Sequence, residues 1–225
     1  MRIRRKKNLE DRLSAANGYL LRADTDILDA REARQNKDIL NFEQIFGNAN
    51  PVSLEIGCGK GGFIIEVAKR NPAKNFLAVE LLDNIIVMAA ESAQKEGVKN
   101  LRFFTCGADY LSRYIKEGSI ERIFLNFSPP YNGSRYENRR LTKDSLVADY
   151  KDFLKCGGEV FQKTDDKIFF DYSFLQFEKH GYSVTDVSED INCGNIENVQ
   201  SEYERKFRNS GVSVYALIAK KSDVL

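Results

Sequence analysis

The chain has few of the residues that bind metals or form disulfides. Its 225 residues include one histidine, His180, and four cysteines that stand far apart with no C-x-x-C pair. Zinc sites and disulfide frameworks usually show their ligands or cysteines at short, recurring spacings. We therefore expect neither a metal site nor a disulfide framework.

Long apolar runs are also absent from the sequence. No stretch approaches the ~18 apolar residues that a membrane span needs. The first seven residues contain five Arg or Lys and lack the apolar core of a signal peptide. We expect a cytoplasmic protein with no membrane contact. Because no repeat or low-complexity linker divides the chain, we expect one globular domain, as a monomer or a homodimer.

Alternating glycines are the most informative feature that the sequence does contain. An apolar run, 52–56, is followed by Gly57, Gly59 and Gly61 and then by a helix-like segment. Glycines at this spacing allow a tight turn and let the backbone come close to a ligand. The pattern Gly57-x-Gly59-x-x-Gly62 also fits dinucleotide-binding loops. The glycines alone therefore leave a dinucleotide and S-adenosylmethionine open.

Of two nearby carboxylates, Glu55 decides between these cofactors. Glu55 stands just before the glycines, where it would repel a pyrophosphate but attract the ammonium group of a methionine. Glu80 ends a second strand-like run, 76–80, and suits the ribose of either cofactor. A P-loop is excluded because Lys60 is followed by glycine and not by Ser or Thr. We predict S-adenosylmethionine as the cofactor.

Strand-like and helix-like segments alternate along most of the chain. The predicted strands are 52–56, 76–80, 101–105, 123–127, 159–163, 183–187 and 212–219. The predicted helices include 84–96, capped by Gly97, 143–154, stopped by Gly157 and Gly158, and a short helix around 202–207. Such alternation predicts a mainly parallel sheet, to which the last two strands could add an antiparallel edge pair.

These segments predict an α/β fold. We expect a doubly wound, mainly parallel seven-stranded sheet with helices on both faces, the Rossmann-like architecture of class I S-adenosylmethionine-dependent methyltransferases. Residues 1–47 should form a basic arm and helices, closed by Gly47, that pack on a methyltransferase domain at 48–225. Ligands of open α/β sheets lie at the carboxyl edge of the strands, so the loops after the strands should carry the site.

The loop after 123–127 begins with Ser128-Pro129-Pro130-Tyr131, which resembles the signature of methyltransferases that act on exocyclic amines of cytosine or adenine. Such an amine needs a hydrogen-bond acceptor for its hydrogens and an aromatic ring that stacks on the base. A rigid turn fixed by two prolines is the structural alternative. Farther along, Arg135, Arg139 and Arg140 surround Tyr136, and basic groups around an aromatic ring suit phosphate contacts with base stacking.

Blocks spread over nearly the whole chain resemble the bacterial tRNA (guanine-N7)-methyltransferase family. They are Met1-Arg2-x-Arg4, Glu55-x-Gly57-x-Gly59-Lys60-Gly61, Leu125-Asn126-Phe127-Ser128, Arg135-x-x-x-Arg139-Arg140-Leu141-Thr142, Lys163-Thr164-Asp165 and Glu202-Tyr203-Glu204-x-Lys206-Phe207. The resemblance implies methyl transfer from S-adenosylmethionine to N7 of a guanosine in tRNA, in the variable loop (position 46).

The resemblance also implies roles for individual residues. Those that hold the cofactor are Glu55, Gly57, Gly59, Gly61 and Glu80, with Asp109 nearby as a further candidate. Those that hold RNA are Arg135, Tyr136, Arg139 and Arg140. Those that form the guanine pocket are Asp165, Ser201, Glu202, Tyr203 and Glu204.

Two carboxylates of this pocket, Asp165 and Glu204, are the candidates for a role in the chemistry. They could accept the N1 and N2 hydrogens of guanine and balance the positive charge that arises at N7. A helix N-cap for Asp165 and a surface charge for Glu204 are the structural alternatives.

The chain departs from the family pattern at several positions. The family usually has Asp-Pro-Trp-Pro-Lys where this chain has 129–133, a histidine at Tyr136, and at Gly107 an aspartate that contacts the cofactor adenine. Two alternatives therefore stay open. One is an amino-methyltransferase that uses Ser128 to Tyr131, and the other is a catalytically silent RNA-binding paralogue.

Overall fold

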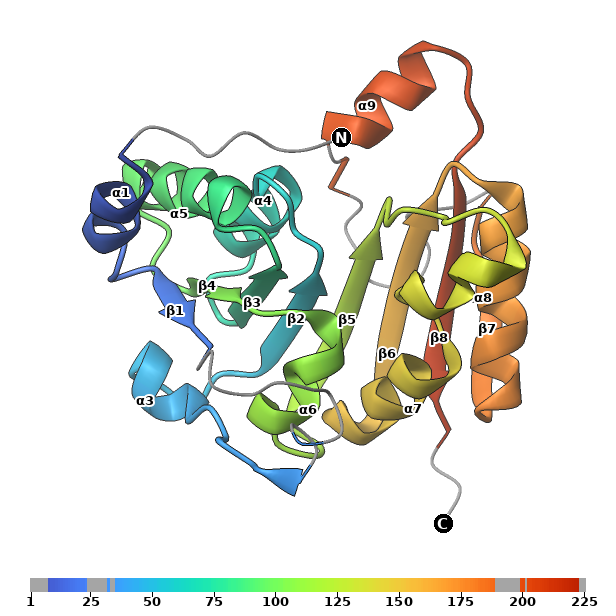
Figure 1. Cartoon of the computed structure of the whole chain (residues 1–225), viewed down its shortest axis with the longest axis horizontal. Coiled ribbons are helices and arrows are strands. Elements are labelled where there is room, and N and C mark those ends of the chain that lie inside the picture. The colour runs from blue at the N-terminus through green and yellow to red at the C-terminus, as the bar shows by residue number, and fades with distance from the viewer. Residues whose placement is uncertain (1–7, 24–31, 33–34, 189–198, 201, 223–225) are drawn as a thin grey trace. The chain divides into compact units, whose positions relative to one another are not determined.

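The structure is a computed structural model that describes residues 8–23, 32, 35–188, 199–200 and 202–222. The chain divides into two compact units, Met1–Ile115 and Lys116–Leu225, which are described one at a time (Figure 1). Each unit contributes four of the eight strands among the described residues, where the sequence predicts seven. The single methyltransferase domain predicted at 48–225 stays a prediction.

Unit 1 contains four parallel strands connected by helices. The strands are β1 (Leu20–Arg22), β2 (Val52–Ile56), β3 (Asn75–Glu80) and β4 (Leu101–Thr105), and they lie in the order β1-β4-β3-β2. Helix α4 (Gly62–Arg70) connects β2 with β3, and α5 (Asp83–Glu96) connects β3 with β4. The predicted strands at 52–56, 76–80 and 101–105 are confirmed, as is the helix at 84–96 with Gly97 as its cap.

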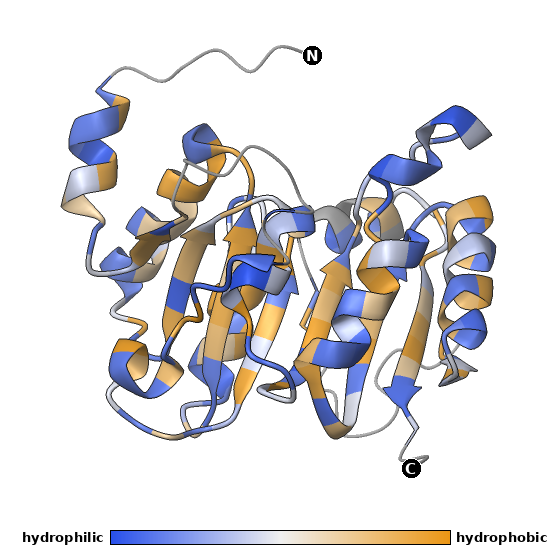
Figure 2. Ribbon diagram, turned by 60° about the horizontal axis from the view of Figure 1, so that its bottom comes forward, coloured by the Kyte–Doolittle hydropathy of each residue, from blue (hydrophilic) through white to orange (hydrophobic). Residues whose placement is uncertain are grey.

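Helices cover both faces of the unit 1 sheet, as predicted. Two neighbouring residues of β4 show this, because successive side chains of a strand point to opposite faces. Phe103 lies on the face where Ala89 of α5 and Ile65 of α4 pack close to Gly61. Phe104 makes an edge contact with Tyr114 of the short helix α6 (Leu111–Tyr114), with ring centroids 5.0 Å apart. Hydrophobic residues accordingly gather in the strands (Figure 2).

The N-terminal segment contains a strand that the sequence does not predict. Helices α1 (Leu9–Ala15) and α3 (Phe42–Phe46) confirm part of the helical prediction for 9–46, and Gly47 caps α3 in the left-handed conformation. Between them, β1 pairs in parallel with β4. Three residues are too few to show a period of two, so the local sequence carries no strand signal there.

Unit 2 contains a mixed sheet. Its strands are β5 (Ile120–Asn126), β6 (Leu154–Thr164), β7 (Tyr182–Asp186) and β8 (Tyr215–Lys221), and they lie in the order β5-β6-β8-β7. Strands β5 and β6 are parallel, whereas β8 is antiparallel to both of its neighbours, which confirms the predicted antiparallel pair. The helices are α7 (Asp144–Phe153), α8 (Lys167–Lys179) and α9 (Glu202–Asn209). No helix among the described residues is long and apolar enough to cross a bilayer.

The helix predicted at 143–154 ends close to the predicted position, but the predicted reason for its end is wrong. Helix α7 ends at Phe153 and β6 begins directly at Leu154, so Gly157 and Gly158 lie inside the strand. A Cβ at Gly158 would come within 3.0 Å of the carbonyl oxygen of Glu121. Glycine is needed there because two backbones approach closely, not because a helix stops.

The substitution Gly61→Ala is expected to destabilise unit 1. Gly61 has a φ of +78°, and an added Cβ would lie 2.9 Å from Cβ of Ala89 and 3.3 Å from side-chain atoms of Ile65 and Phe103. Backbone strain and overpacking together should cost about 2–5 kcal/mol. Gly97→Ala is the matched control, because Gly97 has a φ of +67° but open space around its Cβ position; it should cost about 1–2 kcal/mol. Urea unfolding without cofactor measures both, and equal losses would contradict the close packing at Gly61.

Candidate active site

The glycine loop after β2 has the conformation that its sequence requires. Gly57, Gly59 and Gly61 have φ values of 80°, 56° and 78°, in the region that side chains disfavour. The backbone N–H groups of Gly57 and Cys58 both donate to the carbonyl oxygen of Val79, at 2.8 and 3.0 Å. A Cβ at Gly59 would meet no atom within 4 Å. The space beside this backbone is therefore open to a ligand.

The carboxylate of Glu80 holds the glycine loop at the end of β3. Its Oε2 accepts a hydrogen bond from the backbone N–H of Gly59 at 3.2 Å. Its Oε1 accepts from the N–H groups of Leu81 and Leu82, at 2.9 and 3.1 Å. Charge-assisted bonds of this kind are stronger than neutral ones. Glu80 therefore fixes the loop in addition to the ribose contact that the sequence predicts for it.

Negative charge surrounds the loop. Glu55 is only 2% exposed, although it is a carboxylate. The pKa of the Cys58 thiol is raised well above its usual range, first by burial and then by the charges of Glu55 and Glu80. These carboxylates lie close enough to act on one thiol, and such a site favours a cationic ligand.

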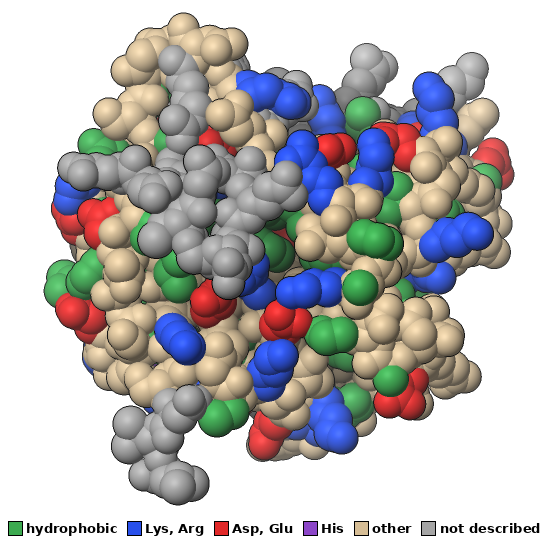
Figure 3. Space-filling model, turned by 180° about the vertical axis from the view of Figure 1, so that it is seen from behind, with side chains coloured by type: hydrophobic (Ala, Val, Ile, Leu, Met, Phe, Trp, Pro, Cys, Tyr) green, Lys and Arg blue, Asp and Glu red, His purple; other side chains and the backbone are tan. Residues whose placement is uncertain are grey.

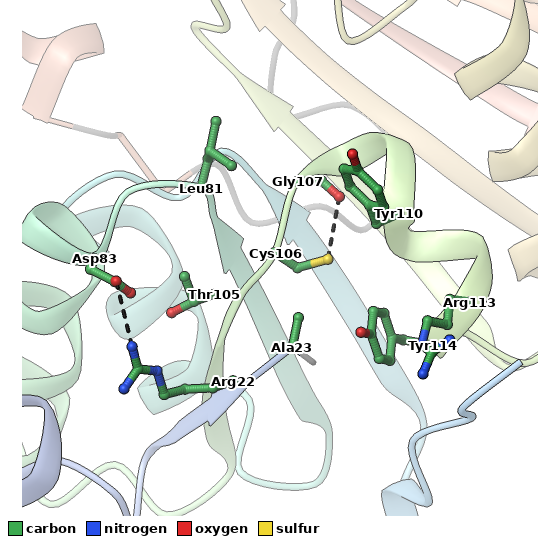
Figure 4. A pocket seen from close by; sticks show the side chains of 10 residues that line it. All are labelled: Arg22, Ala23, Leu81, Asp83, Thr105, Cys106, Gly107, Tyr110, Arg113 and Tyr114. Atoms are coloured by element: carbon green, nitrogen blue, oxygen red, sulfur yellow. Dashed lines mark hydrogen bonds and ion pairs between the residues drawn. The ribbon is translucent and has the colours of Figure 1, made fainter. Parts of the chain in front are cut away.

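A cavity of about 300 Å³ opens at the carboxyl edge of β1, β4 and β3 (Figure 4). Its lining residues are Arg22, Ala23, Leu81, Asp83, Thr105, Cys106, Gly107, Tyr110, Arg113 and Tyr114. In Figure 4 the Arg22–Asp83 ion pair lies on one side of the cavity and Tyr110 on the other. Among the described residues, Thr105 Oγ1 and Asp83 Oδ1 are buried without a hydrogen-bond partner. The cavity therefore offers an apolar wall together with buried polar atoms.

The predicted cofactor residue Asp109 is not among the residues that line this cavity. It lies half-buried in the short turn η1 (Ala108–Tyr110), next to residues that do line it. Leu81 and Tyr110, which line the cavity, were not predicted from the sequence. Their places directly after Glu80 and shortly after Gly107 were the signal that could have found them.

In unit 2, the loop after β5 has an unusual backbone conformation and is bonded by Arg140. Phe127 and Tyr131 at its two ends both have positive φ values, 50° and 44°. Ser128 is buried, and its hydroxyl has no hydrogen-bond partner in the described part of the chain. The guanidinium of Arg140 donates to the carbonyl oxygens of Pro130 and Tyr131, at 2.9 and 3.3 Å. The Arg140 side chain therefore holds the backbone of this loop in place.

Arg140, predicted as an RNA contact, makes its described contacts within the protein. Its side chain is buried, and its guanidinium carbon lies 4.2 Å from the ring centroid of Tyr172. Through these contacts Arg140 positions the loop at 128–131. Its role in RNA binding stays a prediction.

The other basic residues of this region are exposed around Tyr136. The guanidinium carbons of Arg135 and Arg139 lie 4.5 and 5.4 Å from the Tyr136 ring centroid, in and around the turn η2 (Ser134–Arg139). The structure thus brings together the predicted basic and aromatic groups. Elsewhere charges are mixed, and the face in Figure 3 shows Lys and Arg interspersed with Asp and Glu.

Asp165 is exposed at the end of β6. The alternative that it caps helix α8 is wrong, because Asp166 is the N-cap and accepts a hydrogen bond from the N–H of Phe169 at 2.8 Å. Asn132 from the neighbouring loop donates to the other oxygen of Asp166 at 3.3 Å. Asp165 is therefore available to a ligand at the edge where β5 and β6 end.

Glu204 is completely buried, so the alternative of a surface charge is wrong. Its Oε2 lies 2.5 Å from Nζ of Lys163, whose side chain is also fully buried. This role of Lys163 was not predicted from the sequence, although the residue belongs to the family-like block Lys163-Thr164-Asp165. Ser201 and the side chains of Glu202 and Tyr203 lie outside the described part of the structure.

Comparison with known proteins gives the family. A family profile described as "Putative methyltransferase" matches residues 49–217. A tRNA (guanine-N(7)-)-methyltransferase of Streptococcus thermophilus (strain CNRZ 1066) is 35% identical over 224 residues, which is 99% of this chain and 100% of the relative. The chain belongs to the tRNA (guanine-N7)-methyltransferase family. A family member from Geobacillus sp. (strain WCH70) is 41% identical over 175 residues, or 77% of this chain and 80% of the relative.

Solved structures with low sequence identity share the methyltransferase fold. The 16S rRNA methyltransferase KamB has a TM-score of 0.60 at 15% identity, over 83% of this chain and 95% of that one. A precorrin-6y C5,15-methyltransferase from Geobacter metallireducens has a TM-score of 0.54 at 16% identity, over 91% and 96%. The predicted fold class is thereby confirmed.

Arg140→Lys is expected to destabilise unit 2 by about 1–3 kcal/mol. A lysine cannot reproduce the stacking on Tyr172 together with the bonds to two carbonyl groups. Arg139→Lys is the matched control because Arg139 is exposed, and it should change stability by no more than about 0.5 kcal/mol. Urea unfolding of both variants tests this, and a harmless Arg140→Lys would show that the loop does not depend on the guanidinium.

Proposed function

We propose that the protein transfers a methyl group from S-adenosylmethionine to N7 of a guanosine in tRNA, in the variable loop. The full-length relationship to a tRNA (guanine-N(7)-)-methyltransferase is the observation that carries this proposal. The anionic glycine loop in unit 1 and the exposed Arg–Tyr–Arg cluster in unit 2 support it. An enzyme with a tRNA substrate is expected to work in the cytoplasm.

The donor part of the site fits S-adenosylmethionine, which supplies a methyl group on a sulfonium centre when bound. Buried Glu55 would attract its ammonium group, and Glu80 would accept hydrogen bonds from its ribose. The open space beside Gly59 would admit the part of the cofactor that connects its ammonium group with its ribose. The cavity lined by Leu81 and Tyr110 would receive the apolar faces of the adenine.

Methyl transfer to guanine N7 requires little of the protein beyond positioning the base and the methyl donor. Guanine N7 has a free in-plane lone pair and no proton to lose, so no general base is needed. The exposed carboxylate of Asp165 would accept hydrogens from the base and stabilise the positive charge that develops at N7. Arg135, Tyr136 and Arg139 would hold the RNA through phosphate contacts and stacking.

A second candidate is an amino-methyltransferase that acts on an exocyclic amine of a nucleic acid. The buried hydroxyl of Ser128, which lacks a partner among the described residues, favours this candidate. The hydroxyl could accept a hydrogen from an amine while the ring of Tyr131 stacks on the base.

A nucleoside digest distinguishes these functions. Unmodified tRNA is incubated with the protein and S-adenosylmethionine labelled in its methyl group, and the RNA is then digested. We expect the label in 7-methylguanosine, and its loss when the variable-loop guanosine is replaced by adenosine. Label in N6-methyladenosine or N4-methylcytidine would support the second candidate. Binding of tRNA without any label would identify a silent RNA-binding protein.

Two substitutions should separate cofactor binding from RNA binding. Glu80→Ala removes charge-assisted hydrogen bonds and should raise the Kd for the cofactor about 10–100-fold, with little change in tRNA affinity. Arg139→Ala should leave cofactor binding unchanged, weaken tRNA binding and lower the slope of log affinity against log salt by about 1. Calorimetry and filter binding measure these effects, with the exposed residue Arg70 substituted as a control. Equal effects of both substitutions on both ligands would refute the division.

A further inference from the structure

A lysine and a glutamate are completely buried together in unit 2. Nζ of Lys163 in β6 lies 2.5 Å from Oε2 of Glu204 in α9, and both side chains are 0% exposed. The same ammonium group donates to the carbonyl oxygen of Val199 at 3.2 Å. Burial of two charges costs about as much as their attraction returns, and a well-packed apolar pair is often equally stable. Stability alone therefore does not account for the pair.

This ion pair joins the segments that carry the candidate acceptor site. Lys163 stands two residues before Asp165, at the end of β6. Its backbone carbonyl oxygen accepts a hydrogen bond from the N–H of Phe127, where the loop after β5 begins. Figure 1 shows α9, which carries Glu204, beyond the arrowheads of β5 and β6. One lysine thus connects the ends of two strands with the C-terminal segment.

A ring contact also holds helix α9 at this place. Among its described side chains, Glu204 is buried and Phe207 is half-buried, whereas Arg205 and Asn209 are exposed. The ring of Phe207 lies 5.7 Å from that of Phe127, centroid to centroid. The ion pair and this ring contact both tie α9 to the ends of β5 and β6.

We propose that Lys163 is a positioning residue for the acceptor base. Its ammonium group binds the Glu204 carboxylate and the Val199 carbonyl, and it thereby ties these two residues to the end of β6. In this arrangement Glu204 anchors α9, and the exposed carboxylate of Asp165 is left to accept the hydrogens of the base. The assignment rests on the proposed function, since it concerns the pocket for the methyl acceptor.

Lys163→Met tests the proposal in the full-length protein. It should lower kcat/KM for tRNA by about 100-fold or more, because small displacements of a positioned substrate are costly. The Kd for S-adenosylmethionine should change less than about twofold, and amide hydrogen exchange in residues 202–209 should accelerate. Lys179→Met, which breaks an exposed ion pair with Asp144, is the matched control and should change none of these.

A double variant separates positioning from stability. Lys163→Met combined with Glu204→Met removes both charges and keeps the volume, so its Tm should stay within roughly 3 °C of the wild type. Its kcat/KM for tRNA should remain as low as that of Lys163→Met, because the ammonium group that bonded Val199 and Glu204 is gone. A double variant with wild-type kcat/KM would overturn the proposal.

The hydrogen-exchange measurement keeps this test independent of the activity. If the wild-type protein left tRNA unlabelled, the proposed function would fail, but α9 could still be examined. Unchanged exchange in residues 202–209 of Lys163→Met would then overturn the positioning role on its own. Faster exchange together with impaired binding of S-adenosylmethionine would also overturn it, because the effect would not be confined to the acceptor side.

Discussion

In-register parallel pairing of β2, β3 and β4 is the constraint on which the cofactor part of the site depends. Ile56 pairs with Val79, and Glu80 pairs with Thr105, so the strands end at nearly the same level. The loops that follow must leave the sheet at one edge. Because the turn after β2 bonds back to Val79, the N–H of Gly59 meets the Glu80 carboxylate. A slip of one residue between the strands would separate these groups and turn the buried side chains toward the wrong face.

Periodicity and turn chemistry were sufficient to predict most of the fold. The bounds of β2 and β4 follow from their apolar runs, and Gly47 and Gly97 cap helices because both adopt a positive φ. Strand β1 could not be predicted, since its three residues are held by backbone pairing with β4 and carry no pattern of their own. Gly158 was misread for a similar reason. Its need for glycine arises from a backbone far away along the chain.

For the site, the sequence identified residue types but not their partners. Charged side chains were assigned to solvent or to ligands, which is where single charges usually lie. Arg140 and Glu204 are instead buried against groups 10 and 41 residues away, and such pairings are decided by tertiary packing. The adjacent residues Asp165 and Asp166 were also hard to tell apart from the sequence. Which of two adjacent carboxylates caps α8 depends on where the helix begins, and a pattern places that start only within a residue or two.

The place of β8 in the sheet has a consequence for the order in which the chain can fold during synthesis. Strand β8 lies between β6 and β7, and it is the only described strand paired with β7. A ribosome therefore releases β6 and β7 before the strand that joins them exists. Until residues 215–221 emerge, β6 has an open edge and β7 has no partner. Strands β2, β3 and β4 face no such delay, because they follow one another in both sequence and sheet, although β1 must wait for β4. Nascent unit 2 therefore leaves strand edges open to mispairing and to chaperones until β8 is made.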